Sequence, residues 1–209
     1  MRVKVCGITS VGDAAAAVTA GADALGLVFY AGSRRAVSAA QAAEIVMAVP
    51  PLVMTVGLFV NATPEAITEI LERVPLNLLQ FHGDESPDDC AAFDRPYIKA
   101  LPVTGDAGLH SRMASYTSAR GFLLDTPAPG RFGGTGETFD WSQVPADSPR
   151  PLLLAGGLNA GNVAAAIAAV RPAAVDVSSG VESAPGIKDP VKMQQFVAAA
   201  RAAFEESAI

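Results

Sequence analysis

The sequence predicts an α/β fold, a single-domain (β/α)8 TIM barrel that spans residues 1–209. Two observations lead to this prediction. Short runs rich in Val, Ile, Leu and Phe alternate with Ala-rich segments along the chain, a pattern typical of a parallel sheet with helical crossovers. Eight such units fit into 209 residues, a length at which α/β barrels form one domain. The alternative is a doubly wound open sheet, which would more often have fewer strands and a Gly-rich loop after the first.

The expected elements follow one another in regular order. We expect strands at residues 2–6, 24–29, 53–59, 76–81, 97–101, 121–124, 152–155 and 174–177. We expect helices near residues 11–20, 38–48, 63–74, 86–94, 106–117, 159–170 and 189–203, with a weak, short one near 140–144.

Helix start signals support several of these ranges. The hydroxyls of Thr9 and Ser10 are suited to cap the helix near 11–20. The helix near 63–74 is well marked, because Thr63 fits a cap and Pro64 fits the first turn. Its apolar residues fall on one face, namely Ile67, Ile70, Leu71 and Val74.

Composition excludes several classes of protein. The net charge is −6 without a basic cluster, which argues against nucleic-acid binding. No apolar run is long enough to span a membrane, and charges at Arg2, Lys4 and Asp13 interrupt any signal-peptide pattern, so we expect a cytoplasmic protein. Two cysteines and two histidines favour neither a disulfide framework nor a metal site.

The first strand carries apolar and reactive side chains on opposite faces. Because side chains alternate along a strand, Val3 and Val5 point one way, while Lys4 and Cys6 point the other. The same rule directs Phe81, Ile98, Leu124 and Val177 toward the helices. It leaves a polar set facing the barrel axis or its upper rim, namely Lys4, Cys6, Gln80, His82, Lys99, Asp125 and Asp176.

A polar barrel interior indicates a functional site. A barrel core that serves only packing would be branched and apolar, and buried charges are costly unless they are paired. We therefore expect Lys4 and Lys99 to provide counter-charges to the aspartates. The alternative is that individual members of this set lie at solvated strand ends.

Two glycine-containing stretches resemble a phosphate cradle. Gly156-Gly157 ends the seventh strand, and Ser179-Gly180 follows the eighth. Barrels of this type bind phosphate with the loops after strands 7 and 8, often together with a short extra helix, which we expect near residues 183–186. The alternative for either glycine pair is an ordinary turn.

Two further loops reach the same rim. The long Gly-rich segment 125–141 is predicted to be a lid or substrate loop, since loops of this length are usually functional; the alternative is plain surface structure. The loop 30–38 contains Arg34 and Arg35, whose guanidinium groups suit a carboxylate or phosphate. Arginines in loops are otherwise most often solvated.

Seven motifs in order resemble the phosphoribosylanthranilate isomerase family of tryptophan biosynthesis. They are Lys4-Val5-Cys6-Gly7-Ile8-Thr9, Gly57-Leu58-Phe59-Val60-Asn61, Leu79-Gln80-Phe81-His82-Gly83-Asp84-Glu85, Gly133-Gly134-Thr135-Gly136, Phe139-Asp140-Trp141, Leu154-Ala155-Gly156-Gly157-Leu158 and Asp176-Val177-Ser178-Ser179-Gly180-Val181-Glu182. The resemblance runs from Arg2 to beyond Asp189.

The resemblance implies a (β/α)8 barrel and a cofactor-free Amadori rearrangement of N-(5'-phosphoribosyl)anthranilate. It makes Cys6 the general base and Asp125 the general acid, and it makes the loops at Gly156-Gly157 and Ser179-Gly180 the phosphate holders. It also implies that Arg35 meets the anthranilate carboxylate, and that the pocket is lined by His82 and Asp176.

Some positions, in two stretches, depart from the family pattern. The Ser-Pro-Arg-Tyr after the second strand is here Ser33-Arg34-Arg35-Ala36, and Glu137 stands where lysine is common after Gly-Gly-Thr-Gly. These departures leave open which arginine meets the carboxylate and how the long loop closes.

The chemistry needs one acid and one base. The acid protonates the furanose oxygen and opens the ring to a Schiff base, and the base removes the C2′ proton. A cysteine with an ordinary pKa is a poor base at neutral pH, but a neighbouring cation such as Lys4 would favour the thiolate. The alternative for Cys6 is a small buried hydrophobe, which is our interpretation of Cys90.

Two other functions stay open at this point. A different phosphosugar enzyme on the same barrel, such as an epimerase or an indole-glycerol-phosphate synthase, would share the phosphate loops. A non-catalytic phosphosugar-binding module is the second. We expect a small-molecule substrate as the partner, no membrane or nucleic acid, and a monomer or homodimer.

Overall fold

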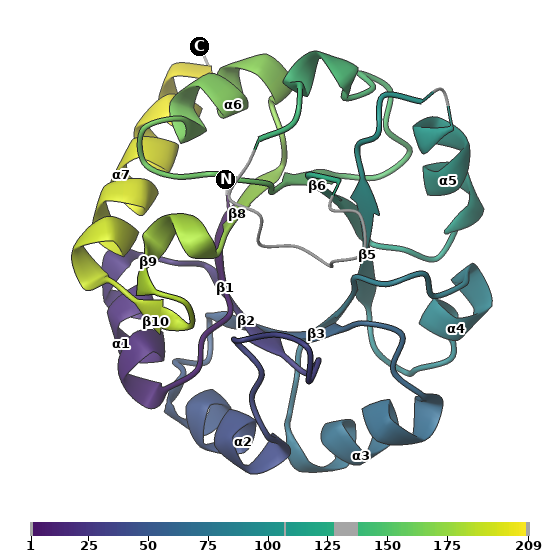
Figure 1. The fold of residues 1–209 in the computed structure, drawn as a ribbon, viewed down its shortest axis with the longest axis vertical. Coiled ribbons are helices and arrows are strands. Elements are labelled where there is room, and N and C mark those ends of the chain that lie inside the picture. Colours follow the sequence, from purple (N-terminus) through teal and green to yellow (C-terminus); the bar gives the residue numbers. More distant parts are fainter. Residues whose placement is uncertain (1, 107, 128–137, 208–209) are drawn as a thin grey trace.

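Eight parallel strands close into a barrel in the order β1 to β8 (Figure 1). The computed structural model describes residues 2–106, 108–127 and 138–207. The strands are β1 (Arg2–Cys6), β2 (Ala24–Val28), β3 (Met54–Phe59), β4 (Leu78–Phe81), β5 (Tyr97–Pro102), β6 (Gly121–Asp125), β7 (Leu152–Leu154) and β8 (Ala174–Val177). The predicted (β/α)8 barrel is confirmed, and each strand end lies within two residues of its expected position.

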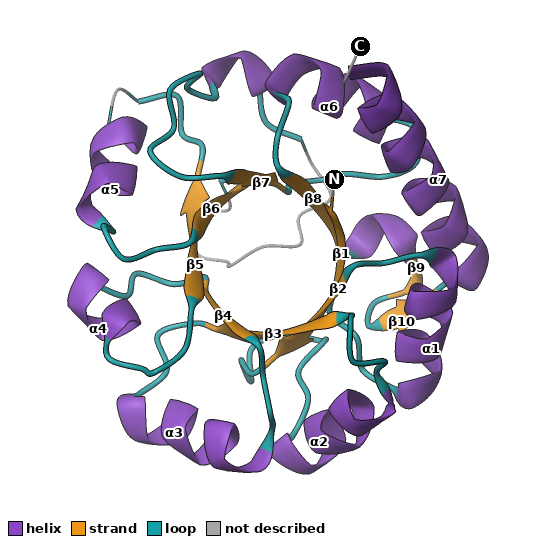
Figure 2. Ribbon diagram, turned by 180° about the vertical axis from the view of Figure 1, so that it is seen from behind, coloured by secondary structure: helices purple, strands orange, loops and turns teal. Residues whose placement is uncertain are grey.

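The helices form a ring outside the barrel (Figure 2). They are α1 (Val11–Ala20), α2 (Ala39–Ala48), α3 (Pro64–Arg73), α4 (Pro87–Ala91), α5 (Leu109–Ser115), α6 (Val163–Val170) and α7 (Pro190–Ser207), with a 3-10 helix η1 (Trp141–Gln143) before β7. Side chains of Ser10 and Thr63 cap α1 and α3 as expected. No helix in the described part of the chain combines the length and apolar character that crossing a bilayer requires.

The helix α6 begins later than its expected start at residue 159. The reason is local hydrogen bonding in the turn before it. The Asn159 side chain accepts from the Gly161 amide at 2.8 Å, and the Asn162 side chain accepts from the Asn159 amide at 2.8 Å. These short polar side chains satisfy backbone groups outside a helix, which favours a turn.

Apolar side chains pack on both sides of the strands. Val3, Val5, Phe81, Leu124 and Val177 belong to the main core between barrel and helices. A smaller cluster fills the barrel interior below the rim, with Ile98, Ala100, Leu123 and Ala155 as its buried members. The alternation rule thus holds on four of the five strands for which it was stated.

On β5 the predicted facing is wrong by one residue. Ile98 packs in the interior cluster, whereas Lys99 shares the outer face with Tyr97 and Leu101. Lys99 is buried there, because its ammonium group lies 3.2 Å from Glu85 and 2.6 Å from the Gly83 carbonyl oxygen. A buried lysine with these partners is as well satisfied outside the barrel as inside.

The short helix expected near residues 183–186 is also not present. A 3-10 helix η2 (Ser179–Val181) follows β8, and the chain then forms a small hairpin of β9 (Glu182–Ala184) and β10 (Ile187–Lys188). Gly186 adopts a left-handed φ of 84° at the hairpin tip, directly after a proline. Proline followed by glycine favours a turn over a helix.

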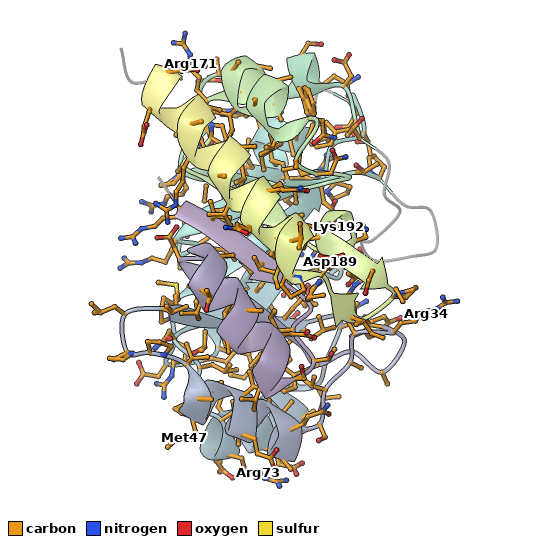
Figure 3. All side chains as sticks on the ribbon, turned by 90° about the vertical axis from the view of Figure 1, so that its left-hand side faces the viewer. Arg34, Met47, Arg73, Arg171, Asp189 and Lys192 are labelled. Carbon is orange, nitrogen blue, oxygen red and sulfur yellow. The ribbon has the colours of Figure 1, made fainter. Side chains whose placement is uncertain are left out.

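The last helix closes the ring. α7 packs against α1 and α6 (Figure 1), and Arg201 on α7 donates to the Gly21 carbonyl oxygen at 2.7 Å. At its start, the Asp189 carboxylate accepts from the Val191 and Lys192 amides; Figure 3 labels Asp189 and Lys192 there. A carboxylate at this end of a helix satisfies amides that lack a partner in the helix.

Candidate active site

The carboxyl ends of the strands surround two adjoining pockets. The first contains Cys6, Arg35, Gln80 and His82 together with side chains from the second and third strands. The second is lined mainly by Ala155, Gly156, Gly157, Leu158 and Ser179. Asp125, Asp176 and Ser178 line both pockets, so the two form one continuous depression at the barrel mouth.

A buried ion pair forms its floor. Lys4 and Asp176 stand opposite each other on β1 and β8, and the Lys4 ammonium group lies 2.8 Å from an Asp176 carboxylate oxygen. Burial disfavours the Lys4 charge, but Asp176 and Cys6 outweigh burial and raise its pKa. Burial raises the pKa of Asp176, with Lys4 acting in the opposite direction. The expected counter-charge role is thus confirmed for Lys4 and wrong for Lys99, which pairs with Glu85 instead.

Cys6 lies directly above this pair, and its thiol is buried. Burial raises the pKa of the Cys6 thiol, Lys4 lowers it, and Asp176 raises it further. The expected effect of Lys4 therefore has the right sign, but burial outweighs it. Gly26 provides the space opposite the thiol, because a Cβ atom there would lie 2.7 Å from the Cys6 sulfur and 3.1 Å from the Lys4 nitrogen.

Asp125 faces Cys6 across the mouth and has one neighbour at each of its two carboxylate oxygens. One of its oxygens accepts from the Thr126 amide at 2.8 Å. The other lies 3.2 Å from His82 Nε2. His82 Nδ1 in turn lies 2.9 Å from the Gln80 amide nitrogen, so the three side chains follow one another from β4 to β6, with a hydrogen bond between Gln80 and His82 and an ion-pair distance between His82 and Asp125.

Of the two arginines in the loop after β2, only Arg35 faces the pocket. Its Nε and Nη2 donate to the two oxygens of Glu182 at 2.7 and 2.8 Å, and its stem packs against Gly7, where a Cβ atom would collide with it. Arg34 is exposed and extends away from the barrel rim (Figure 3).

Glu182 is shared between two cations. The buried Lys188 on β10 donates to Glu182 at 2.9 Å and to the Ser178 carbonyl oxygen at 3.1 Å. Burial opposes the charge of Glu182, but its bonds to Arg35 and Lys188 lower its pKa. Burial lowers the pKa of Lys188, with Glu182 acting in the opposite direction. The β9–β10 hairpin thereby fixes the position of the Arg35 guanidinium group.

The loops after β7 and β8 form a backbone cradle. Gly156 and Gly157 have left-handed φ values of 82° and 60°. A Cβ atom on Gly156 would collide with Thr126, and one on Gly180 would collide with the Leu158 carbonyl oxygen. The four predicted residues Gly156, Gly157, Ser179 and Gly180 thus lie in two loops that meet, and two of the glycines are required by close backbone approach.

Sequence reasoning missed several residues that shape this site. Glu182 was part of a motif without a role, and neither Lys188 nor Gly26 was singled out. A signal for Glu182 was available in its charge. Strands β2 and β8 both neighbour β1, so the loops that follow them lie close together and an acidic residue in one is suited to pair with an arginine in the other. The central part of the predicted lid, with Gly133-Gly134-Thr135-Gly136 and Glu137, lies outside the described residues.

Comparison with known proteins identifies the family of this chain. The profile of the N-(5'phosphoribosyl)anthranilate (PRA) isomerase family matches residues 3–199. An N-(5'-phosphoribosyl)anthranilate isomerase of Pseudomonas fluorescens is 59% identical over 201 residues, covering 96% of each chain. One of Stutzerimonas stutzeri is 59% identical over 197 residues, covering 94% of this chain and 95% of the relative.

Solved structures give the same result. Phosphoribosyl anthranilate isomerase from Thermotoga maritima has a TM-score of 0.89 at 44% identity, covering 97% of this chain and 99% of that one. A phosphoribosyl anthranilate isomerase in complex with reduced 1-(o-carboxyphenylamino)-1-deoxyribulose 5-phosphate has a TM-score of 0.86 at 42% identity, with the same coverage. The chain therefore belongs to the phosphoribosylanthranilate isomerase family, and it is an isomerase enzyme.

Proposed function

We propose that this isomerase converts N-(5'-phosphoribosyl)anthranilate to 1-(2-carboxyphenylamino)-1-deoxyribulose 5-phosphate in tryptophan biosynthesis, with Cys6 as general base and Asp125 as general acid. One observation carries the assignment. Cys6 and Asp125 line the same pocket from β1 and β6, and the glycine loops after β7 and β8 lie between them around the barrel. The strand order thus supports a substrate whose phosphate is anchored between acid and base.

The reaction balances with these two groups alone. Protonated Asp125 gives its proton to the furanose oxygen, the bond between C1′ and that oxygen breaks, and a Schiff base forms at C1′. The Cys6 thiolate then takes the C2′ proton, and the electron pair of that C–H bond moves to give an enolamine. Tautomerisation of the enolamine yields the ketone, and the two groups exchange protons with solvent to complete the cycle.

The environment of Cys6 makes its thiolate scarce but strongly basic. Because burial raises its pKa, the thiolate is a minor species in the free enzyme at neutral pH, and each thiolate formed there is strongly basic. The Lys4 ammonium group stabilises it when the proton leaves. Asp176 keeps Lys4 in place through the 2.8 Å ion pair.

The remaining residues serve binding. The Arg35 guanidinium group, held by Glu182, keeps free N–H donors for the anthranilate carboxylate. Backbone amides around Gly156-Gly157 and Ser179-Gly180 hold the phosphate. His82 and Asp176 line the part of the pocket between these two anchors.

The test is turnover of the anthranilate substrate by purified protein, followed by loss of anthranilate-type fluorescence. Saturable turnover that depends on both Cys6 and Asp125 is the expected result. Binding of the substrate without turnover would favour a phosphosugar-binding module. Turnover of another phosphosugar alone would favour a different enzyme on the same barrel.

We also propose that the chain acts in the cytoplasm as a monomer or a homodimer. One solved relative consists of monomers generated from the dimeric phosphoribosylanthranilate isomerase of Thermotoga maritima. Light scattering on the eluting protein distinguishes the two states, and a higher oligomer would contradict the proposal.

A further inference from the structure

Gln80 is a buried polar side chain that the reaction as described does not use. It lies on β4, two residues before His82, and its side chain is completely shielded from solvent. Its amide nitrogen lies 2.9 Å from His82 Nδ1. Its amide oxygen has no hydrogen-bond partner among the described residues. An arrangement that leaves a buried carbonyl unsatisfied needs a reason.

The direction of the hydrogen bond to His82 follows from this arrangement. The amide nitrogen is a donor only, so Nδ1 of His82 must accept. With the amide turned round, its oxygen would accept from a protonated Nδ1, and a buried N–H group would be left without a partner. Orphaned buried N–H groups are rarer than unsatisfied carbonyls. Neutral His82 therefore carries its proton on Nε2, the ring nitrogen that lies 3.2 Å from an Asp125 oxygen.

This tautomer has a consequence for Asp125. A second proton that enters the His82–Asp125 pair cannot reside on Nδ1 without breaking the Gln80 bond, which disfavours the imidazolium ion and so favours a proton on Asp125. Within the described ranges, the other charged or titratable side chains at the pocket are Cys6 with Lys4 from β1, Asp176 from β8, and Tyr30 and Arg35 from the loop after β2. Of these cations, Lys4 is engaged by Asp176 and Arg35 by Glu182.

We propose that Gln80 is a positioning residue for the isomerisation. Its amide N–H keeps His82 neutral with Nδ1 unprotonated, so that the catalytic proton is stored on Asp125. Without this donor, a proton on Nδ1 would break no hydrogen bond and the imidazolium ion would form more readily beside Asp125, and a neighbouring cation favours the ionised form of a carboxyl group. The proposal rests on the acid role of Asp125 in the proposed function.

The tautomer is measured directly by nitrogen NMR on protein labelled with ¹⁵N-histidine. The chain has only two histidines, and a His110→Gln variant assigns the signals, since His110 is half-exposed on α5 and far from the pocket. We expect Nδ1 of His82 to be unprotonated in the wild-type enzyme at neutral pH, with the proton on Nε2. A protonated Nδ1 in the wild-type enzyme at neutral pH overturns the proposal.

Gln80→Glu tests the functional consequence. A carboxylate at this position accepts from a protonated Nδ1 and so favours the imidazolium ion. We expect kcat at neutral pH to fall roughly 10- to 100-fold, the usual effect of removing an orienting partner, with KM changed less than about threefold. The ratio of its kcat to that of the wild type should recover toward lower pH, whereas a purely structural defect would leave this ratio unchanged.

Gln80→Met is the matched control, because it preserves the length of the side chain and removes both donor and acceptor. We expect an intermediate loss of kcat and a wild-type circular dichroism spectrum. A Gln80→Glu enzyme with wild-type kcat and an unchanged pH profile would contradict the proposal. Full activity of Asp125→Asn would instead refute the acid role while leaving the NMR result valid, so the two failures are distinguishable.

Discussion

Cys6 and Lys4 share one face of β1, and burial and charge act on the thiol in opposite directions. Because burial raises the pKa of Cys6 above its ordinary value of 9.0, we expect its alkylation rate by iodoacetamide to be still rising above pH 9. Inorganic phosphate or a substrate analogue should protect it. A rate that levels off near neutral pH would show that Lys4 outweighs burial.

Replacement of the thiol tests its role in catalysis. Cys6→Ala should lower kcat by at least ~10²-fold, the usual scale for a general base. Cys90→Ala is the matched control, because Cys90 is also buried but lies on α4, away from the pocket. Steady-state kinetics on both variants decides, and near-normal turnover by Cys6→Ala refutes the assignment.

Substitution of Asp125 distinguishes a role as general acid from a purely structural role. One of its oxygens accepts from the Thr126 amide and the other lies 3.2 Å from His82. Among the described residues it pairs with no lysine, since Lys4 and Lys99 have other partners. Asp125→Asn should therefore lose roughly 10²–10⁴-fold in kcat with little change in KM or in the unfolding midpoint. A destabilised variant whose folded fraction turns over normally would exclude the acid role.

At the scale of the secondary-structure elements, the loop after β7 is tested with a matched pair of substitutions. Gly157 has a left-handed φ of 60°. Asn and Asp tolerate this backbone conformation to a similar degree, but only Asp adds a negative charge. We expect Gly157→Asp to weaken binding of substrate and inorganic phosphate much more than Gly157→Asn does. Equal affinities in titration calorimetry would place the phosphate elsewhere.

The β9–β10 hairpin allows a test in which two explanations of Glu182 predict opposite changes in KM. If Glu182 orients Arg35, Glu182→Gln should raise KM by up to roughly 30-fold, since an arginine side chain has about 2 kcal/mol of rotamer entropy to regain. If Glu182 only competes with the substrate carboxylate, KM should fall. Arg34→Gln is the control and should leave KM unchanged, because Arg34 extends into solvent (Figure 3).

The same variant has a defined pH dependence of stability. The pKa of Glu182 is lowered below its ordinary 4.5 in the folded protein, so its stabilising contribution is present above about pH 4.5 and is lost as the pH falls through the folded value. The difference in unfolding free energy between wild type and Glu182→Gln should shrink over that range. Urea titrations at several pH values measure it.

The elements differ in how far sequence could predict them. Alternation along β1, β4, β6 and β8 correctly placed Cys6 and Asp125 on the inner face, because apolar partners fix the register there. It failed on β5, because Ile98 and Lys99 are both suited to either face of the strand. Lys99 faces outward there because it pairs with Glu85, which lies in another part of the chain. The ion pair between Arg35 and Glu182 joins residues that are 147 positions apart in the chain. No local sequence pattern contains such a contact.

At the scale of the whole molecule, we propose that the chain is one cooperative domain, and Ile67 and Trp141 allow this to be tested. Ile67 is a buried residue of α3. This helix lies on the opposite side of the barrel from η1, which holds the only tryptophan of the chain (Figure 1). Ile67→Ala should cost about 2–5 kcal/mol. If the closed barrel unfolds as one unit, Trp141 fluorescence and circular dichroism must shift together to the same lower urea midpoint. A tryptophan transition that stays at the wild-type midpoint while the dichroism becomes biphasic would divide the barrel into two units.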